Sequence, residues 1–197
     1  DCKLTMMDRW ILGALNSLIK KVDTELEGYH ITEAARELVD FVDIMSNWYV
    51  RRCRRRFWMS ELTEDKIAAY VTLYTVLDSL IRMAAPFVPF ITETIYQSLV
   101  RKNNPDTPIS IHMCSFPVCD ESYIDEKLEH DMELVYNSVG IARNARNLAN
   151  LKIRQPLSRL LVCVDGDDAK FDEEMLSIIA EELNVKEVIF TDNVSEF

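Results

Sequence analysis

Five arginines within six positions are the residues of this sequence that most clearly indicate a binding chemistry. The stretch NWYVRRCRRRFW, residues 47–58, contains Arg51, Arg52, Arg54, Arg55 and Arg56. A guanidinium group is planar and permanently charged, and it matches the oxygens of a phosphate in a two-pronged geometry. Aromatic rings on both sides are suited to stack on bases or sugars. The stretch therefore predicts contact with a nucleic-acid backbone or with an acidic partner.

A structural explanation competes with this one. Cations at the C-terminal end of a helix complement its dipole, and one or two arginines would satisfy that role. Five exceed it, so we favour a binding role for Arg51, Arg54, Arg55 and Arg56. Arg52 continues an apolar stripe, so we expect it to be structural and paired with a carboxylate. The aromatic residues expected to serve structure beside it are Trp48, Tyr49 and Trp58.

A second basic stretch lies between residues 141 and 164, which contain five bases and no acid. We expect a second phosphate-contacting patch there, formed by Arg143, Arg146, Lys152 and Arg154. A basic linker between two structural units is an equally good interpretation. The chain has a net charge of -11, but residues 165–197 hold 11 acids against two lysines. The overall acidity therefore does not exclude a polyanionic partner, because local patches decide that question.

Catalytic and metal-binding motifs are not evident. The three histidines are far apart in the sequence, and there is no glycine-rich phosphate loop and no nucleophile motif. Cys114 and Cys119 have the spacing C-x4-C, but no second Cys or His pair follows, and a zinc site needs about four ligands. We expect neither catalytic residues nor a metal site. An odd number of cysteines, five, favours a reducing compartment over a disulfide framework.

Targeting segments are also not evident. No apolar run approaches the roughly 20 residues that a membrane span requires. The N-terminal stretch DCKLTMMDRW is too charged for a signal peptide, and it does not begin with an initiator methionine. We therefore expect the chain to be a piece of a longer protein.

Helical periodicity positions the arginines. The first 85 residues contain no proline and only two glycines. Apolar residues spaced by three or four predict a first helix that ends at Gly28, a second from about Glu33 to Arg56 with Thr32 as its N-cap, and a third that follows Thr63 and ends at Pro86. A fourth begins near Pro89, and a fifth spans about residues 124–150.

The pattern changes towards the C-terminal end. The segment ISIHMCSF, residues 109–116, alternates and is predicted to be extended. After Pro156, LSRLLVCV and VKEVIF read as strands on either side of a helix over residues 171–183. The predicted fold class is mainly α: an antiparallel helical bundle over residues 1–150, followed by a small α+β unit over residues 151–197.

Several segments occur in the order found in one enzyme family. They are DRWIL (8–12), SNWYVRRCRRRFW (46–58), AYVTLYTVL (69–77), APFVPFITETIYQSL (85–99), LKIRQPL (151–157) and EELNVKEVIF (181–190). In this order they resemble the C-terminal part of the isoleucyl-tRNA synthetases, which are class I enzymes. APFVPF is shared with the valyl, leucyl and methionyl relatives, whereas NWYVRRCRRRFW together with IRQPL is the isoleucyl-like combination.

The resemblance implies an anticodon-binding helical bundle. Its partners would be isoleucine tRNA and the catalytic domain of the same parent chain, in the cytoplasm, with neither DNA nor a membrane involved. The parent would ligate isoleucine to its tRNA with ATP and Mg in a catalytic domain. No H-x-G-H or KMSKS-like string occurs, so no cofactor is expected here. The alternatives are the same domain of a sibling synthetase, or a helical module that binds an acidic protein.

The resemblance also suggests where the arginines act. The first two helices are each about 25 residues, or roughly 37 Å long, and a short turn should make them antiparallel. If the first helix leaves the catalytic core, the second returns to it. The arginines would then contact the tRNA backbone inside the L or dock the core, with Trp48, Tyr49, Arg52 and Trp58 as structural or core-docking residues. At the far end, Tyr29, His30 and Phe87 become the candidates for reading bases.

Overall fold

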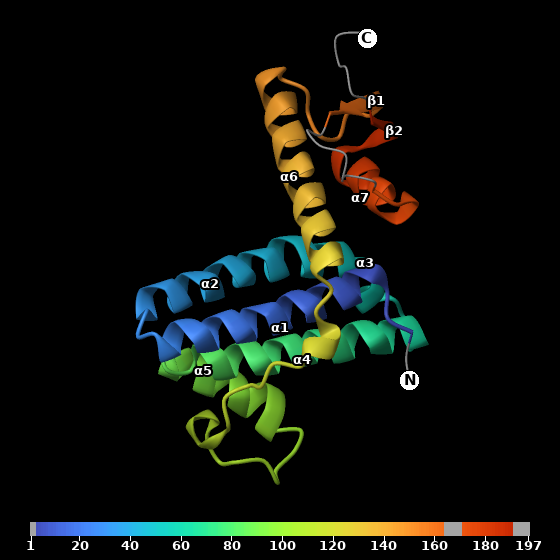
Figure 1. The fold of residues 1–197 in the computed structure, drawn as a ribbon. Helices are drawn as coiled ribbons and strands as arrows, with labels where there is room; N and C mark the ends of the chain where they lie inside the picture. The colour runs from blue at the N-terminus through green and yellow to red at the C-terminus, as the bar shows by residue number, and fades with distance from the viewer. Residues whose placement is uncertain (1–2, 164–170, 191–197) are drawn as a thin grey trace. The chain divides into compact units, whose positions relative to one another are not determined.

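Helices make up most of the chain, and the described strands form one two-stranded parallel sheet (Figure 1). The computed structural model describes residues 3–163 and 171–190. Contacts divide the chain into two compact units, Asp1–Asp125 and Glu126–Phe197. We had expected a boundary near residue 150. The division falls earlier because the fifth predicted helix packs against the C-terminal helix of the α+β unit.

The first unit begins with a helical hairpin. Helix α1 (Met6–Glu27) starts at a capping box and ends at Gly28, and Tyr29 in the turn has a φ of 61°. Helix α2 (Ile31–Ile44) continues through a π-helical segment (Met45–Val50) into α3 (Arg51–Trp58).

Contacts between the two arms of this hairpin show its direction. Lys21 pairs with Glu37 near the turn, at 2.7 Å between Nζ and Oε1, and Tyr49 donates a hydrogen bond to Asp8 at the other end. The second arm therefore folds back along the first. The start of α2 differs from the expectation in one detail, because His30 rather than Thr32 is the N-cap.

Helix α4 (Glu64–Ala84) begins where the sequence predicts, because the Thr63 side chain accepts a hydrogen bond from the backbone N–H of Lys66 at 3.2 Å. Contrary to expectation, α4 is long and apolar enough to cross a membrane by length and composition. That property alone is weak evidence for a span, because long core helices share it, and α4 packs against α1, α3 and α5.

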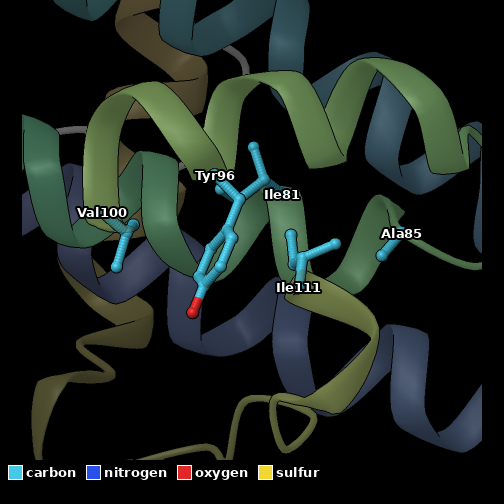
Figure 2. Close-up of a cluster of buried hydrophobic side chains, with 5 residues drawn as sticks. All are labelled: Ile81, Ala85, Tyr96, Val100 and Ile111. Atoms are coloured by element: carbon cyan, nitrogen blue, oxygen red, sulfur yellow. The ribbon is translucent and has the colours of Figure 1, made fainter. Parts of the chain in front are cut away.

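Helix α5 (Pro89–Tyr96) starts at a proline as expected and continues as a π-helical turn (Gln97–Arg101). A small apolar cluster joins it to α4 (Figure 2): Ile81, Ala85, Tyr96, Val100 and Ile111. The Tyr96 hydroxyl donates to the carbonyl of Pro108 at 2.8 Å and so holds the following loop.

The extended segment predicted over residues 109–116 is wrong, because Ile111–Met113 form a 3-10 turn. The Glu93 carboxylate accepts hydrogen bonds from the Ser110 hydroxyl and the backbone N–H of Ile111, each at 2.9 Å. These side-chain contacts stabilise a turn that the apolar alternation does not reveal. A second 3-10 turn, Glu121–Tyr123, precedes the end of the first unit.

The second unit contains α6 (Glu126–Leu148), β1 (Leu157–Val162), α7 (Glu173–Leu183) and β2 (Val185–Phe190). The strands are parallel, with Leu157 opposite Val185. Both strands and both helices were predicted from the sequence. Asn184, which links α7 to β2, has a left-handed backbone conformation with a φ of 51°.

Candidate nucleic-acid interface

Arg56 of α3 is held inside the first unit by two carboxylates. Its Nη1 and Nη2 donate to Oδ1 and Oδ2 of Asp8, each at 2.8 Å, and its Nε donates to Oδ2 of Asp65 at 3.0 Å. The side chain of Asp8 is 0% exposed and that of Arg56 is 15% exposed. A two-pronged, charge-assisted pair of this kind fixes geometry strongly. Arg56 therefore bridges the first turns of α1 and α4.

Further hydrogen bonds complete the environment of Asp8. The Tyr49 hydroxyl donates to Oδ1 at 2.7 Å, and the Thr5 hydroxyl and backbone N–H donate to Oδ2 at 2.7 and 3.0 Å. Burial alone would raise the pKa of Asp8, but the hydrogen bonds from Arg56, Thr5 and Tyr49 outweigh it and hold that pKa below its ordinary value. Burial and the contact with Asp8 raise the pKa of Tyr49. At neutral pH the carboxylate is therefore ionised and the phenol is neutral.

The structure changes the role predicted for Arg56 and places Arg52 against a different partner from the one predicted. We expected Arg56 to contact a nucleic acid, but both of its neighbouring carboxylates engage it. We expected Arg52 to continue the buried stripe, but Cys53 and Phe57 do so instead. The π-helical segment before α3 explains the change, because an extra residue per turn shifts the helical face that points inwards. Arg52 instead lies over the ring of Trp48, 5.8 Å from its centroid.

The exposed part of the cluster consists of Arg51, Arg54 and Arg55. The guanidinium of Arg54 lies over the exposed ring of Trp58, 4.4 Å from its centroid. Nε of Arg51 donates to the carbonyl of Asn47 at 2.8 Å. Arg54 and Arg55 make no ion pair with any residue that the structure describes. This face, Arg51, Arg54, Arg55 and Trp58, presents cations beside an open aromatic ring, and we call it the arginine face.

The three aromatic residues predicted to be structural are placed differently from one another. Trp48 and Tyr49 are buried within the helical unit. Trp58 is 73% exposed, so it is not a core residue of this unit. Met59 and Leu62, which follow it in the chain, are also exposed.

The far end of the helical unit carries the predicted base-reading residues. Arg56 joins the first turns of α1 and α4, which have 22 and 21 residues and lie alongside each other (Figure 1). Their C-terminal ends therefore lie about 30 Å away from the arginine face, at about 1.5 Å per residue. Tyr29 is 86% exposed there, and His30 contacts Glu25 at 2.9 Å.

Phe87 is half-buried, whereas Phe90, which we did not predict, is 88% exposed in the first turn of α5. Its position directly after the helix-starting Pro89 is the signal that was available in the sequence. Phe90 is therefore the more accessible aromatic ring of the two.

The basic residues of the second unit also separate into buried and exposed members. Arg146 was predicted to contact phosphate, but it is 6% exposed, and its Nη2 donates to the carbonyls of Lys152 and Gln155 at 2.6 and 2.5 Å. Arg143 forms an ion pair with Glu182 on α7. Lys152 and Arg154 are exposed. The prediction for Arg146 is therefore corrected, because backbone carbonyls occupy its guanidinium.

The cysteines and the candidate metal ligands are the remaining reactive groups. In the parts of the chain that the structure describes, no group of three or more His, Cys, Asp or Glu residues is arranged to hold a metal ion. Burial raises the pKa of the Cys53 thiol, although Arg56 donates to its sulfur. Cys114 and Cys119 are half-buried free thiols.

Comparison with known proteins identifies the family of this chain. A family model described as the anticodon-binding domain of tRNA ligase matches residues 8–161. The isoleucine–tRNA ligase of Clostridium novyi (strain NT) is 52% identical over 192 residues, which are 98% of this chain and 18% of that protein. The corresponding ligase of Clostridium kluyveri is 49% identical over 192 residues, and that of Thermobifida fusca 47% over 180. The chain thus spans about a fifth of the length of these relatives.

Replacing Arg56 with leucine should destabilise the helical unit strongly. The change leaves the charge of Asp8 buried without its main partner, a situation that typically costs about 3–5 kcal/mol of unfolding free energy. Urea denaturation followed by circular dichroism measures this. Arg54→Leu is the matched control and should change stability by no more than about 0.5 kcal/mol, because Arg54 is exposed. Equal losses in the two variants would contradict the assignment.

The stabilising effect of Asp8 should depend on pH. Its pKa is lowered by folding, so its contribution is complete above its unfolded pKa of about 3.9 and is lost as the pH falls through the lower folded value. The difference in Tm between the wild type and Asp8→Asn should therefore be larger at pH 7 than at pH 3. Thermal scans of both proteins at the two pH values measure this, and a constant difference would show that the carboxylate charge is not involved.

Proposed function

This chain belongs to the family of anticodon-binding domains of tRNA ligases, and on that premise we propose that it is the tRNA-binding portion of an isoleucine–tRNA ligase. The observation that carries the proposal is 52% identity to such a ligase over 98% of the chain. The whole enzyme would join isoleucine to its tRNA in the cytoplasm. ATP and Mg would act in its catalytic domain, which together with isoleucine tRNA would be the partner of this chain.

The helices of the first unit would form the antiparallel bundle of this family. The hairpin of α1 with α2 and α3 supports this arrangement, since Lys21–Glu37 and Asp8–Tyr49 pair the two arms in opposite directions. The bundle would carry the arginine face at one end and the exposed aromatic residues at the other. Two different contacts with one long RNA molecule would then be possible.

The arginine face would contact the phosphate backbone of tRNA. Arg51, Arg54 and Arg55 are exposed on one short helix, and guanidinium groups bind phosphate oxygens without regard to the base. The ring of Trp58 beneath Arg54 adds a surface on which a base or sugar can stack. Arg56 takes no part in this contact because Asp8 and Asp65 engage it.

The end of the unit that carries Tyr29 and Phe90 would read bases. Tyr29 and Phe90 present open rings, and Phe87 and His30 lie in the same two turns of the chain. Stacking on an aromatic ring contributes about 1–3 kcal/mol per base. Hydrogen-bonding groups such as the imidazole of His30 would add base specificity.

Lys152 and Arg154, with Arg143 beside α7, would form a second backbone contact on the second unit. Both Lys152 and Arg154 are exposed, and neither makes an ion pair within the described residues. Arg143 would contribute less, because Glu182 already neutralises it. The patch is small, so we expect it to supplement the arginine face.

A second role for the end of the unit that carries the arginine face is docking of the catalytic domain of the parent chain. Trp58, Met59 and Leu62 are exposed apolar residues within five positions of the chain, beginning at the arginine face. Exposed apolar groups gathered in this way are typical of an interface. The docking role and the phosphate-binding role predict different results in the experiments below.

Binding of tRNA by the isolated chain should weaken when Arg55 is replaced with alanine. Each phosphate contact that is lost should reduce the slope of log affinity against log salt by about 0.7–0.9. Filter-binding titrations at 50 and 200 mM salt measure both quantities. Arg36→Ala, an exposed arginine on α2, is the matched control and should change neither. An unchanged salt slope in Arg55→Ala would favour docking. Competition between isoleucine and valine tRNAs would separate the sibling families.

In the full-length ligase, replacing Arg54 and Arg55 together with alanine should reduce aminoacylation of every isoleucine tRNA. The loss should be equal for anticodon variants, because phosphate contacts carry no sequence information. Replacing Phe90 with alanine should instead produce a loss that depends on the anticodon. If the arginine double variant shows the anticodon-dependent loss, the two ends have been assigned the wrong way round.

A further inference from the structure

The loop between α6 and β1, residues 151–156, is held by side chains that bind its backbone. Four successive carbonyls each accept a hydrogen bond from a side chain. Nη2 of Arg146 donates to Lys152 and Gln155 at 2.6 and 2.5 Å. Nδ2 of Asn184 donates to the two carbonyls between them, those of Ile153 and Arg154, at 3.2 and 3.0 Å. We call residues 151–156 the clamped loop.

Backbone hydrogen bonds tie both ends of the clamped loop. The N–H of Leu151 donates to the carbonyl of Arg146 at 2.8 Å, which attaches the loop to the end of α6. The N–H of Leu157 donates to the carbonyl of Asn184 at 3.0 Å, which attaches it to the start of the sheet. Within the loop, the N–H of Gln155 donates to the carbonyl of Lys152 at 2.9 Å.

Asn184 can make these contacts because of its unusual backbone. It ends α7 with φ 51° and ψ 52°, a left-handed conformation that asparagine adopts more readily than most residues. In this conformation its carbonyl binds Leu157 while its side-chain amide donates to the loop. One residue thus connects the sheet to the clamped loop.

This arrangement suits the loop to bind an anion. Carbonyl oxygens repel phosphate, and here all four are occupied by donors from the protein. The side chains of Lys152 and Arg154 are exposed and lack ion-pair partners among the described residues. A loop that is ordered before binding also loses less conformational entropy when it binds.

We infer that Asn184 and Arg146 are positioning residues for an RNA-phosphate-binding loop in which Lys152 and Arg154 make the contacts. The inference rests on the proposed function, because it takes tRNA as the ligand. Asn184 and Arg146 act through the backbone of the loop and do not themselves touch phosphate. Two donors on separate elements, α6 and the α7–β2 turn, hold the loop from both sides.

The variant Asn184→Gly tests the inference most directly. Glycine keeps the left-handed conformation without strain but removes the amide that donates to Ile153 and Arg154. In filter binding with tRNA, we expect affinity to fall about fivefold or more, because ordering even one residue on binding has a comparable cost. The salt slope should stay the same, since no charge is removed. Arg146→Lys, which keeps the charge but cannot reach both carbonyls, should act in the same direction.

A double-mutant cycle separates positioning from a general structural role. In a protein that already carries Lys152→Ala and Arg154→Ala, the change Asn184→Gly should have no further effect on tRNA affinity. If Asn184 only supported the fold, its replacement would weaken binding equally in both backgrounds. Thermal unfolding of each variant, followed by circular dichroism, measures the folded fraction in parallel.

The outcomes distinguish this inference from the proposal on which it rests. If Lys152→Ala with Arg154→Ala reduces affinity and salt slope while Asn184→Gly changes neither, the positioning role is overturned and tRNA binding by the loop stands. If the charge variants change nothing although the wild type binds tRNA, both the contact and its positioning are overturned. If the wild type does not bind tRNA at all, the proposed function itself fails.

Discussion

The buried pair of Asp8 and Arg56 is the interaction on which the helical unit depends. A charge placed out of water is costly unless its partners compensate for it, and here two arginine donors, a phenol, a hydroxyl and a backbone N–H all converge on one carboxylate. Such a pair adds little net stability compared with an apolar contact, but it permits only one geometry. It therefore determines how the first turns of α1 and α4 meet the end of α3.

This constraint also separates the two proposed binding surfaces along the unit. Because Arg56 faces inwards and Arg52 lies against Trp48, Arg51, Arg54 and Arg55 are the arginines of α3 that are exposed to solvent. Because α1 and α4 start together and have nearly equal lengths, their far ends bring Tyr29 and Phe90 to one end of the unit. Phosphate contacts position an RNA and base contacts specify it, so a separation of about 30 Å would allow both on one helical unit.

In the second unit, as in the first, a buried arginine is held by oxygen acceptors. Arg146 is buried against carbonyl oxygens rather than carboxylates, and this leaves Lys152 and Arg154 at the surface. In both units, a buried arginine organises the backbone and its exposed neighbours remain available for a ligand. Counting basic residues in the sequence thus overestimates the number that are exposed in each unit.

The sequence by itself determined the helices, the strands and the family of this protein. Caps and periodicity are local properties, so Thr63, Gly28 and Pro89 marked helix ends correctly, and the two strands beside α7 were predicted. Only the tertiary structure decided which arginine is buried, where the units divide and how residues 109–116 fold. Asp8 lies 48 residues from Arg56, and Asn184 lies 30 residues from Arg154. Partners so distant leave no periodic signal, and the π-helical segment before α3 shifts the face that a regular helix would bury.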